Sequence, residues 1–283
     1  MRGKDPAELS DTLSRKYKGV ANNKLKVNDE KTTRQKRRFV NTNNVQIETP
    51  TAIIKPSNVE RLLDAQVHQN IRWVEHILDS DQSLVKSLNL RVGALSKISK
   101  LASFKTRKTI ASGIFMSKLI YLMPLWSGCE DYLVKCLQVV QNKAARTVAR
   151  LSIFTPTRTL MKVCGWMSVR QLLAYHSLVL LQKTLASQTP VYLYKKLTVG
   201  GDFSYKTRKA ATCPPGFSFT VSHPIDSGAL RQESGSKSGL TKQGWCWNSV
   251  ELYNKLPPDL RLERKLTNFK KRLKEWIGLN VAL

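Results

Sequence analysis

Hydrophobic residues recur at the spacing of amphipathic helices in the middle of the chain. The pattern predicts one helix from residue 82, a second over residues 106–122 that Pro124 ends, and a third over residues 130–151. The predicted apolar faces are Leu84, Leu88, Val92, Leu95 and Ile98; Ile110, Ile114, Ser117 and Tyr121; and Leu133, Cys136, Leu137, Val140, Ala144, Thr147, Val148 and Leu151. Such faces must pack against one another, which predicts a helical bundle.

Two further helices are expected after residue 151. A short one follows Pro156 and stops at Gly165, a residue suited to a helix C-terminus. Ser168 and Gln171 stand three residues apart, as in a capping box, and predict a longer helix to about residue 185.

The first 80 residues have a different pattern. A weak helical spacing covers residues 6–21, and later stretches are short and rich in Val, Ile and Thr. They predict a hairpin within residues 39–54, with its turn near residues 41–44, and a strand pair within residues 59–67. This part is expected to be small, irregular and mixed α+β.

The chain ends in two contrasting segments. Gly, Ser, Thr and Pro cluster over residues 199–244 and predict a long flexible loop. The last segment has Phe269, Leu273 and Ile277 at helical spacing. We therefore expect a mainly α protein in four segments, with these bounds: 1–80, 81–198, 199–244 and 245–283.

The charge balance indicates a polyanionic partner. The 283 residues include 47 Lys and Arg against 20 Asp and Glu, a net charge of +27. Residues 132–201 contain ten basic residues and no acidic one. A compact fold with such a surplus repels itself unless a polyanion offsets the charge. Nucleic acid is the first expectation and an anionic membrane surface the second.

No catalytic or metal-binding pattern is evident. The five Cys and four His are scattered without zinc spacing, and no phosphate-binding or hydrolase motif occurs. Asp29 and Glu30 are adjacent, so on a strand they would face opposite sides. Asp79 and Asp81 precede the helix at residue 82, where capping by Ser80, Asp81 or Ser83 is the simpler interpretation. We expect no metal site.

Clustered cations are the candidate binding residues for nucleic acid. Their expected role is contact with phosphates rather than with base edges. They are Lys135, Lys143, Arg146 and Arg150 on the third helix; Arg34, Lys36, Arg37 and Arg38; and Lys270, Lys271, Arg272 and Lys274. Other roles remain open: any one of them can be a solvated side chain, cations near the end of the third helix also complement its dipole, and residues 34–38 can be a nuclear import signal.

Six segments in order carry a family resemblance: NKLKVNDEKT (residues 23–32, with Asn28, Lys31 and Thr32), VERLLDAQVHQNIRWVEHI (59–77, with Asp64, Trp73 and His76), residues 98–128 around PLWSG, LVKCLQVVQNKAARTVAR (133–150), QTPVYL (188–193), and WNSVELYNKLPPDLR with NFKKRLKEWI (247–277). Together they resemble the C-terminal half of the reverse transcriptase of non-LTR (LINE-type) retrotransposons.

The resemblance implies the end of a palm with its primer grip, a helical thumb and a C-terminal basic unit. It implies binding of template–primer, as RNA or an RNA–DNA hybrid, through the backbone. Family members use a divalent metal, Mg²⁺, held by a paired-aspartate YxDD turn, and that turn is absent here. We therefore expect no catalytic residues, no cofactor and no polymerase activity from this chain alone, which would need a separate N-terminal palm and fingers segment.

Two positions depart from the family pattern. Thr32 runs directly into a basic segment where the family has an apolar strand, as a deletion or splice would leave it. Asp64 stands where the family has a glycine; if that turn needs a left-handed residue, Asp is tolerated but less suited than Gly.

Two alternatives remain beside a polymerase fragment: a non-enzymatic RNA-, DNA- or protein-binding module derived from a mobile element, and a non-functional remnant. The first 20 residues do not resemble a secretory signal, and the apolar run over residues 110–126 is short for a membrane span. A soluble intracellular protein, nuclear or cytoplasmic, is expected, with no membrane partner and no small-molecule substrate.

Overall fold

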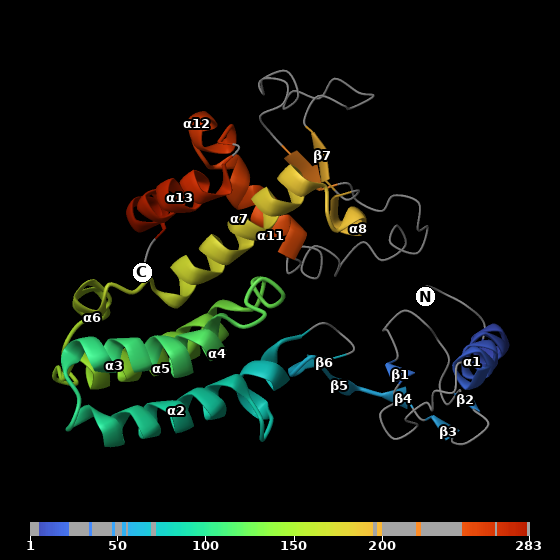
Figure 1. Ribbon diagram of the computed structural model, residues 1–283, viewed down its shortest axis with the longest axis horizontal. Helices are drawn as coiled ribbons and strands as arrows, with labels where there is room; N and C mark the ends of the chain where they lie inside the picture. The colour runs from blue at the N-terminus through green and yellow to red at the C-terminus, as the bar shows by residue number, and fades with distance from the viewer. Residues whose placement is uncertain are drawn as a thin grey trace. The chain divides into compact units, whose positions relative to one another are not determined.

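The computed structural model describes residues 6–22, 34–35, 47–48, 53–54, 56–68, 72–194, 197–199, 219–221, 245–263 and 265–281. The chain divides into two compact units, an N-terminal unit, Met1–Ser80, and a C-terminal unit, Asp81–Leu283. The described chain is mainly helical with a few short strands, as predicted (Figure 1). The division between the units falls where we placed the end of the first segment.

The N-terminal unit begins with α1 (Pro6–Asn22), the predicted helix. Strand β1 (Arg34–Gln35) pairs in parallel with β4 (Pro56–Ser57), and β2 (Ile47–Glu48) pairs antiparallel with β3 (Ile53–Ile54). The expected hairpin turn at residues 41–44 lies outside the described residues. So do six of the candidate or motif residues, namely Asn28, Lys31, Thr32, Lys36, Arg37 and Arg38.

The predicted strand pair is confirmed as an antiparallel hairpin of β5 (Val59–Leu62) and β6 (Ala65–His68). Leu62 pairs with Ala65, so the turn between them has two residues, Leu63 and Asp64. Their φ angles are 49° and 68°, and two positive φ angles define the tight turn that matches the twist of a hairpin. The left-handed conformation at Asp64 is the one that favours glycine.

A short π-helical turn, η2 (Glu75–Asp79), packs against β6. Trp73 and His76 are buried with their rings edge to face, 6.1 Å between centroids. The Gln66 backbone N–H donates to His76 Nδ1 at 3.4 Å. Two of the motif residues therefore lie together under the hairpin as packing residues.

The C-terminal unit starts with α2 (Leu84–Ser99), which Ser83 caps by accepting from the Lys86 N–H at 3.4 Å. After α2 the chain reverses into α3 (Phe104–Ala111) and, beyond a short π-helical turn, α4 (Ser117–Ile120). A second reversal leads into α5 (Asp131–Ala149). Figure 1 shows α2, α3 and α5 side by side, and α5 packs closely on α2.

The predicted face of the second helix is wrong by one residue. Ala111, Phe115 and Leu119 are buried, whereas Ser117 and Tyr121 are exposed. The offset is already present in α3, where Arg107 and Ala111 are buried. The π-helical turn η3 (Ser112–Met116) follows and has more residues per turn than an α-helix, so residues four apart stay on one face through it.

The other predicted faces agree more closely with the structure. Leu84, Leu88 and Leu95 of α2 are buried, and so are Leu133, Leu137, Val140, Ala144 and Val148 of α5. Ile98 and Leu151 are exposed, because they lie at the ends of the two helices where the bundle stops covering them.

Helix α6 (Thr157–Cys164) ends at Gly165 with φ +62°, and α7 (Val169–Ser187) opens with the predicted capping box. A short helix, α8 (Val191–Tyr194), follows. Strand β7 (Leu197–Val199) then pairs with β8 (Phe219–Val221). Residues 200–218 and 222–244, most of the expected loop, lie outside the described residues.

The last three helices are α11 (Trp245–Asn254), α12 (Pro258–Arg261) and α13 (Leu266–Asn280). They share a core with α7, formed by Leu178, Leu181, Val250, Tyr253, Leu256, Leu260, Phe269, Leu273 and Ile277. The basic C-terminal segment is therefore an integral part of the C-terminal unit.

The turn of the β5–β6 hairpin gives the first prediction. Leu63 is an exposed aliphatic residue at a left-handed position, where asparagine is better tolerated. Leu63→Asn should stabilise the hairpin by about 0.5–1 kcal/mol. Amide hydrogen exchange of β5 and β6 measures this, and Leu62→Asn on the strand is the control. Equal protection in both variants would contradict the assignment of the turn.

Candidate nucleic-acid interface

Helix α5 has one exposed face, and that face is basic. Lys135, Val139 and Lys143 are exposed and stand four residues apart, so they share one side of the helix. Among the described residues, none pairs with the ammonium groups of Lys135 and Lys143. We name Lys135, Val139 and Lys143 the basic face of α5.

Acidic residues are nearly absent around this helix. Residues 82–200 contain 18 Lys and Arg and two acids, Glu130 and Asp131. Both acids lie at the N-terminus of α5, where a carboxylate complements the helix dipole. Asp131 also pairs with Arg170 at 2.8 Å. The surface charge along α5 is thus positive, and the two acids offset it only at the first turn of the helix.

Arg146 and Arg150, the other two predicted contacts on this helix, bind the protein itself. Arg146 Nη2 donates to the Thr155 carbonyl at 3.2 Å. Arg150 closes α5 with φ 54° and donates to the Ser99 carbonyl, through Nε at 3.2 Å and through Nη2. These side chains hold the ends of helices in place, so reversing their charge would damage the fold as well as any interface.

A buried arginine that the sequence analysis missed joins the same helix ends. Arg107 is 7% exposed. Its Nε donates to the Val148 carbonyl at 2.7 Å, and Nη1 donates to the carbonyls of Ala102 at 2.6 Å and Ser99 at 3.4 Å. The carbonyls at the end of a helix lack helical partners and carry partial negative charge. The only sequence signal is that Arg107 stands four residues before Ala111, on the face that proves to be buried.

The amide side chains of α5 form a buried network. Gln138 Nε2 donates at 2.9 Å to both Gln141 Oε1 and Asn142 Oδ1, and Gln138 Oε1 accepts from the Val169 N–H at 2.9 Å. Gln141 Nε2 donates to the Met167 carbonyl at 2.9 Å. These amides fix the start of α7 on α5. The amide side chains that alternate with the cations of α5 along the sequence therefore bind within the protein and do not face solvent.

The basic cluster of α13 lies outside its buried face, which Phe269, Leu273 and Ile277 form. Lys271, Arg272 and Lys274 are exposed, and Lys270 is half-buried. Arg272 donates to the Asp259 carbonyl at 3.3 Å and lies 3.9 Å from a Glu263 carboxylate oxygen. Arg272 therefore also binds within the unit, whereas the lysines keep their charge at the surface.

Lys274 brings this cluster against α7. Its Nζ lies 5.5 Å from the centroid of the Tyr175 ring, a cation–π distance. The Tyr175 ring contacts His176 edge to face. Burial lowers the pKa of His176, and the charges of Lys270 and Lys274 lower that pKa further. His176 is therefore a packed histidine that is neutral at neutral pH.

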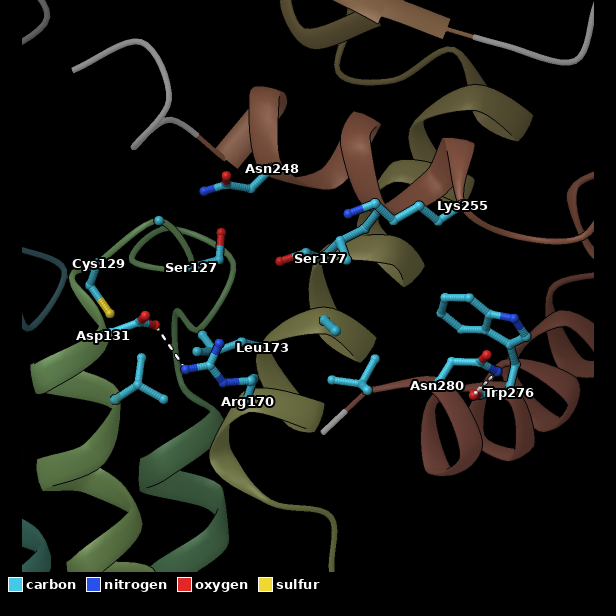
Figure 2. Close-up of a pocket in the computed structure, with 15 residues that line it drawn as sticks. Ser127, Cys129, Asp131, Arg170, Leu173, Ser177, Asn248, Lys255, Trp276 and Asn280 are labelled. Atoms are coloured by element: carbon cyan, nitrogen blue, oxygen red, sulfur yellow. Dashed lines mark hydrogen bonds and ion pairs between the residues drawn. The ribbon is translucent and has the colours of Figure 1, made fainter. Parts of the chain in front are cut away.

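A groove of about 530 Å³ lies between the start of α5 and helices α7, α11 and α13 (Figure 2). The Asp131–Arg170 pair stands at one side of it, with Lys255 and Trp276 on the helices opposite. Burial, with a smaller contribution from the Glu130 charge, raises the pKa of Cys129 to about 12, so this thiol is protonated at neutral pH. No histidine is among the described residues that line the groove.

The remaining predicted site residues do not converge on a catalytic centre. Arg34 lies in β1, and Asp64 is an exposed turn residue whose carboxylate pairs with Arg61. Asp81 pairs with Lys86 at 3.2 Å beside the Ser83 cap, in agreement with the capping interpretation. The described residues contain no group of three His, Cys, Asp or Glu side chains that could hold a metal ion.

Comparison with known proteins adds no relative. No protein-family model, curated protein or solved structure matches the chain. Among the helices that the structure describes, none has the length and apolar composition to cross a membrane.

Arg107 gives the second prediction. Arg107→Met keeps much of the side-chain volume but removes the Arg107 donors from the Val148 and Ala102 carbonyls and leaves the Ser99 carbonyl with Arg150 alone. It should cost about 3 kcal/mol of unfolding free energy. Lys105→Met, at an exposed position of the same helix, should stay within about 0.5 kcal/mol of the parent. Urea unfolding of the full chain measures both, and equal stability of the two variants would refute the structural role.

His176 gives the third prediction. Its pKa in the folded chain lies below the ordinary value of 6.5. The unfolded chain therefore takes up the proton first, and stability should fall as pH drops below about 6.5 and level off below the folded pKa. Lys274→Gln should raise the pKa of His176 in an NMR titration, whereas Lys271→Gln on the same helix should leave it nearly unchanged. A reversed order would show that Lys274 does not act on His176.

Proposed function

We propose that the chain is the template–primer-binding part of a LINE-type reverse transcriptase, and that it binds RNA or an RNA–DNA hybrid through the sugar–phosphate backbone. The observation that carries this proposal is the basic face of α5, within residues 82–200 where 18 cations stand against two acids. A surface of that sign attracts a polyanion and releases its counterions on contact.

The spacing of the basic face suits a linear polyanion. Lys135 and Lys143 are eight residues apart, which is about 12 Å along a helix. A lysine ammonium acts as a point charge that needs little geometric fit, so it contacts phosphates without reading sequence. Binding of this kind is independent of base sequence and falls steeply with salt.

The helical bundle of α2 to α7 would act as the thumb, and α11 to α13 as the basic unit that follows it. The hairpin with Asp64 at its turn, above Trp73 and His76, would be the primer-grip element. The Mg²⁺ that the family uses does not fit the residues described here, since they offer no cluster of acidic ligands. In this proposal the chain grips nucleic acid in the nucleus or cytoplasm, and a separate palm segment would supply any chemistry.

The fourth prediction tests the basic face. Lys135→Gln together with Lys143→Gln should weaken binding to an RNA–DNA hybrid, because two cations no longer meet the phosphates. The slope of log K against log salt should become shallower by about 1 for each phosphate that the protein no longer neutralises. Fluorescence anisotropy across a salt series measures both the affinity and the slope.

The matched control removes the same charge elsewhere. Lys16→Gln with Lys18→Gln, at exposed positions of α1, should change the slope much less. Equal effects of the two double variants would show that only total charge matters. No salt-dependent binding by the parent chain would overturn the proposed function.

A further inference from the structure

Two loops of the C-terminal unit expose large apolar side chains almost completely. Leu101, between α2 and α3, is 91% exposed. Ile153 and Phe154, between α5 and α6, are 73% and 87% exposed. We name these three side chains the apolar tip. Apolar side chains that gather in solvent on one surface mark a contact site more often than scattered ones do.

The two loops lie at the same end of the bundle, because the same carbonyls and arginines hold them. The Ser99 carbonyl at the end of α2 accepts from Arg107 and from Arg150, which closes α5. Arg146 binds the Thr155 carbonyl and ties the second loop to α5. Figure 1 shows the α2–α3 and α5–α6 connections at one end of the helices. The tip is thus presented by anchored loops.

Exposed cations flank the apolar tip in sequence, in the two segments that carry it. They are Lys97, Lys100, Lys105, Arg150 and Arg158. The two acids of residues 82–200 lie at the opposite end of α5, a helix of 19 residues and therefore about 28 Å long. The positive charge near the tip favours an anionic partner, and the tip itself favours a partner that can also contact apolar side chains.

We propose that the apolar tip inserts at an unstacked base step of a duplex whose backbone lies along the basic face of α5. This inference rests on the proposed function. Leucine, isoleucine and phenylalanine side chains act as wedges between bases in proteins that bend nucleic acid, with cations on the flanking phosphates. The basic face leads along α5 toward the tip, so one linear polyanion can contact both, whereas a flat anionic membrane would meet the tip alone.

The test uses the full chain and two short RNA–DNA hybrids of the same sequence, one fully paired and one with a central mismatch beside a 2-aminopurine. The mismatched hybrid should bind roughly tenfold more tightly, because its base step is already unstacked. Its 2-aminopurine fluorescence should rise on binding, as the inserted side chains separate that base from its neighbour.

Leu101→Ser with Phe154→Ser should abolish the preference and the fluorescence change. The control Leu279→Ser replaces a side chain that is equally exposed, at 87%, on α13, and should keep both. Lys135→Gln with Lys143→Gln should weaken both hybrids equally and keep the preference. Circular dichroism melting checks that each variant is folded.

The outcomes separate the two proposals. Salt-dependent binding without a preference for the mismatch would overturn the wedge and leave the backbone contact standing. No binding to either hybrid would overturn both. Tip-dependent binding to vesicles rich in phosphatidylserine, without a hybrid preference, would replace the wedge by a membrane contact.

Discussion

The C-terminal unit depends on a buried positive charge whose partners are backbone carbonyls. Arg107 donates to the last carbonyls of two helices and to the loop that follows one of them. Helix ends normally need water or capping side chains for these carbonyls. One guanidinium supplies the donors for α2 and α5 together, with Arg150 on the same Ser99 oxygen. The C-terminal ends of the two helices are thereby joined to each other and to the loop that follows α2.

The arginine and lysine side chains have different roles in this protein because their chemistry differs. Arginine has a planar fork with several donors and a weakly hydrated charge, which suits carbonyls at the ends of helices. Arg107 and Arg150 are used in this way, and Arg146 binds the carbonyl of Thr155 in the loop before α6. Lysine keeps a strongly hydrated charge at the end of a flexible stem, and Lys135 and Lys143 remain in solvent. Composition alone indicated a polyanion partner, but the side chains that would meet it are mainly the lysines.

Periodicity predicted α2, α5 and α13 because each has an amphipathic face of its own, whereas α8, α11 and α12 were not predicted. The capping box at Ser168, the stop at Gly165 and the strand pair within residues 59–67 were also predicted, since each depends on neighbours in sequence. The roles of Arg107 and Gln138 were not predictable in this way, because each also binds a distant backbone group: the Val148 carbonyl, 41 residues from Arg107, and the Val169 N–H, 31 residues from Gln138. The cations of α5 were predicted to lie on one helix. Which of them bind backbone carbonyls and which remain in solvent depends on the helix ends and loops that pack next to each side chain.

The shared core of α7 and α13 also sets an order of events during synthesis. Leu178 and Leu181 of α7 are covered by Phe269, Leu273 and Ile277, which follow about 90 residues later. At a translation rate of about 5–20 residues per second, roughly 5–20 seconds separate the two helices as they leave the ribosome. During that interval the apolar face of α7 has no partner from α13, so the nascent chain exposes an apolar surface that the finished fold conceals.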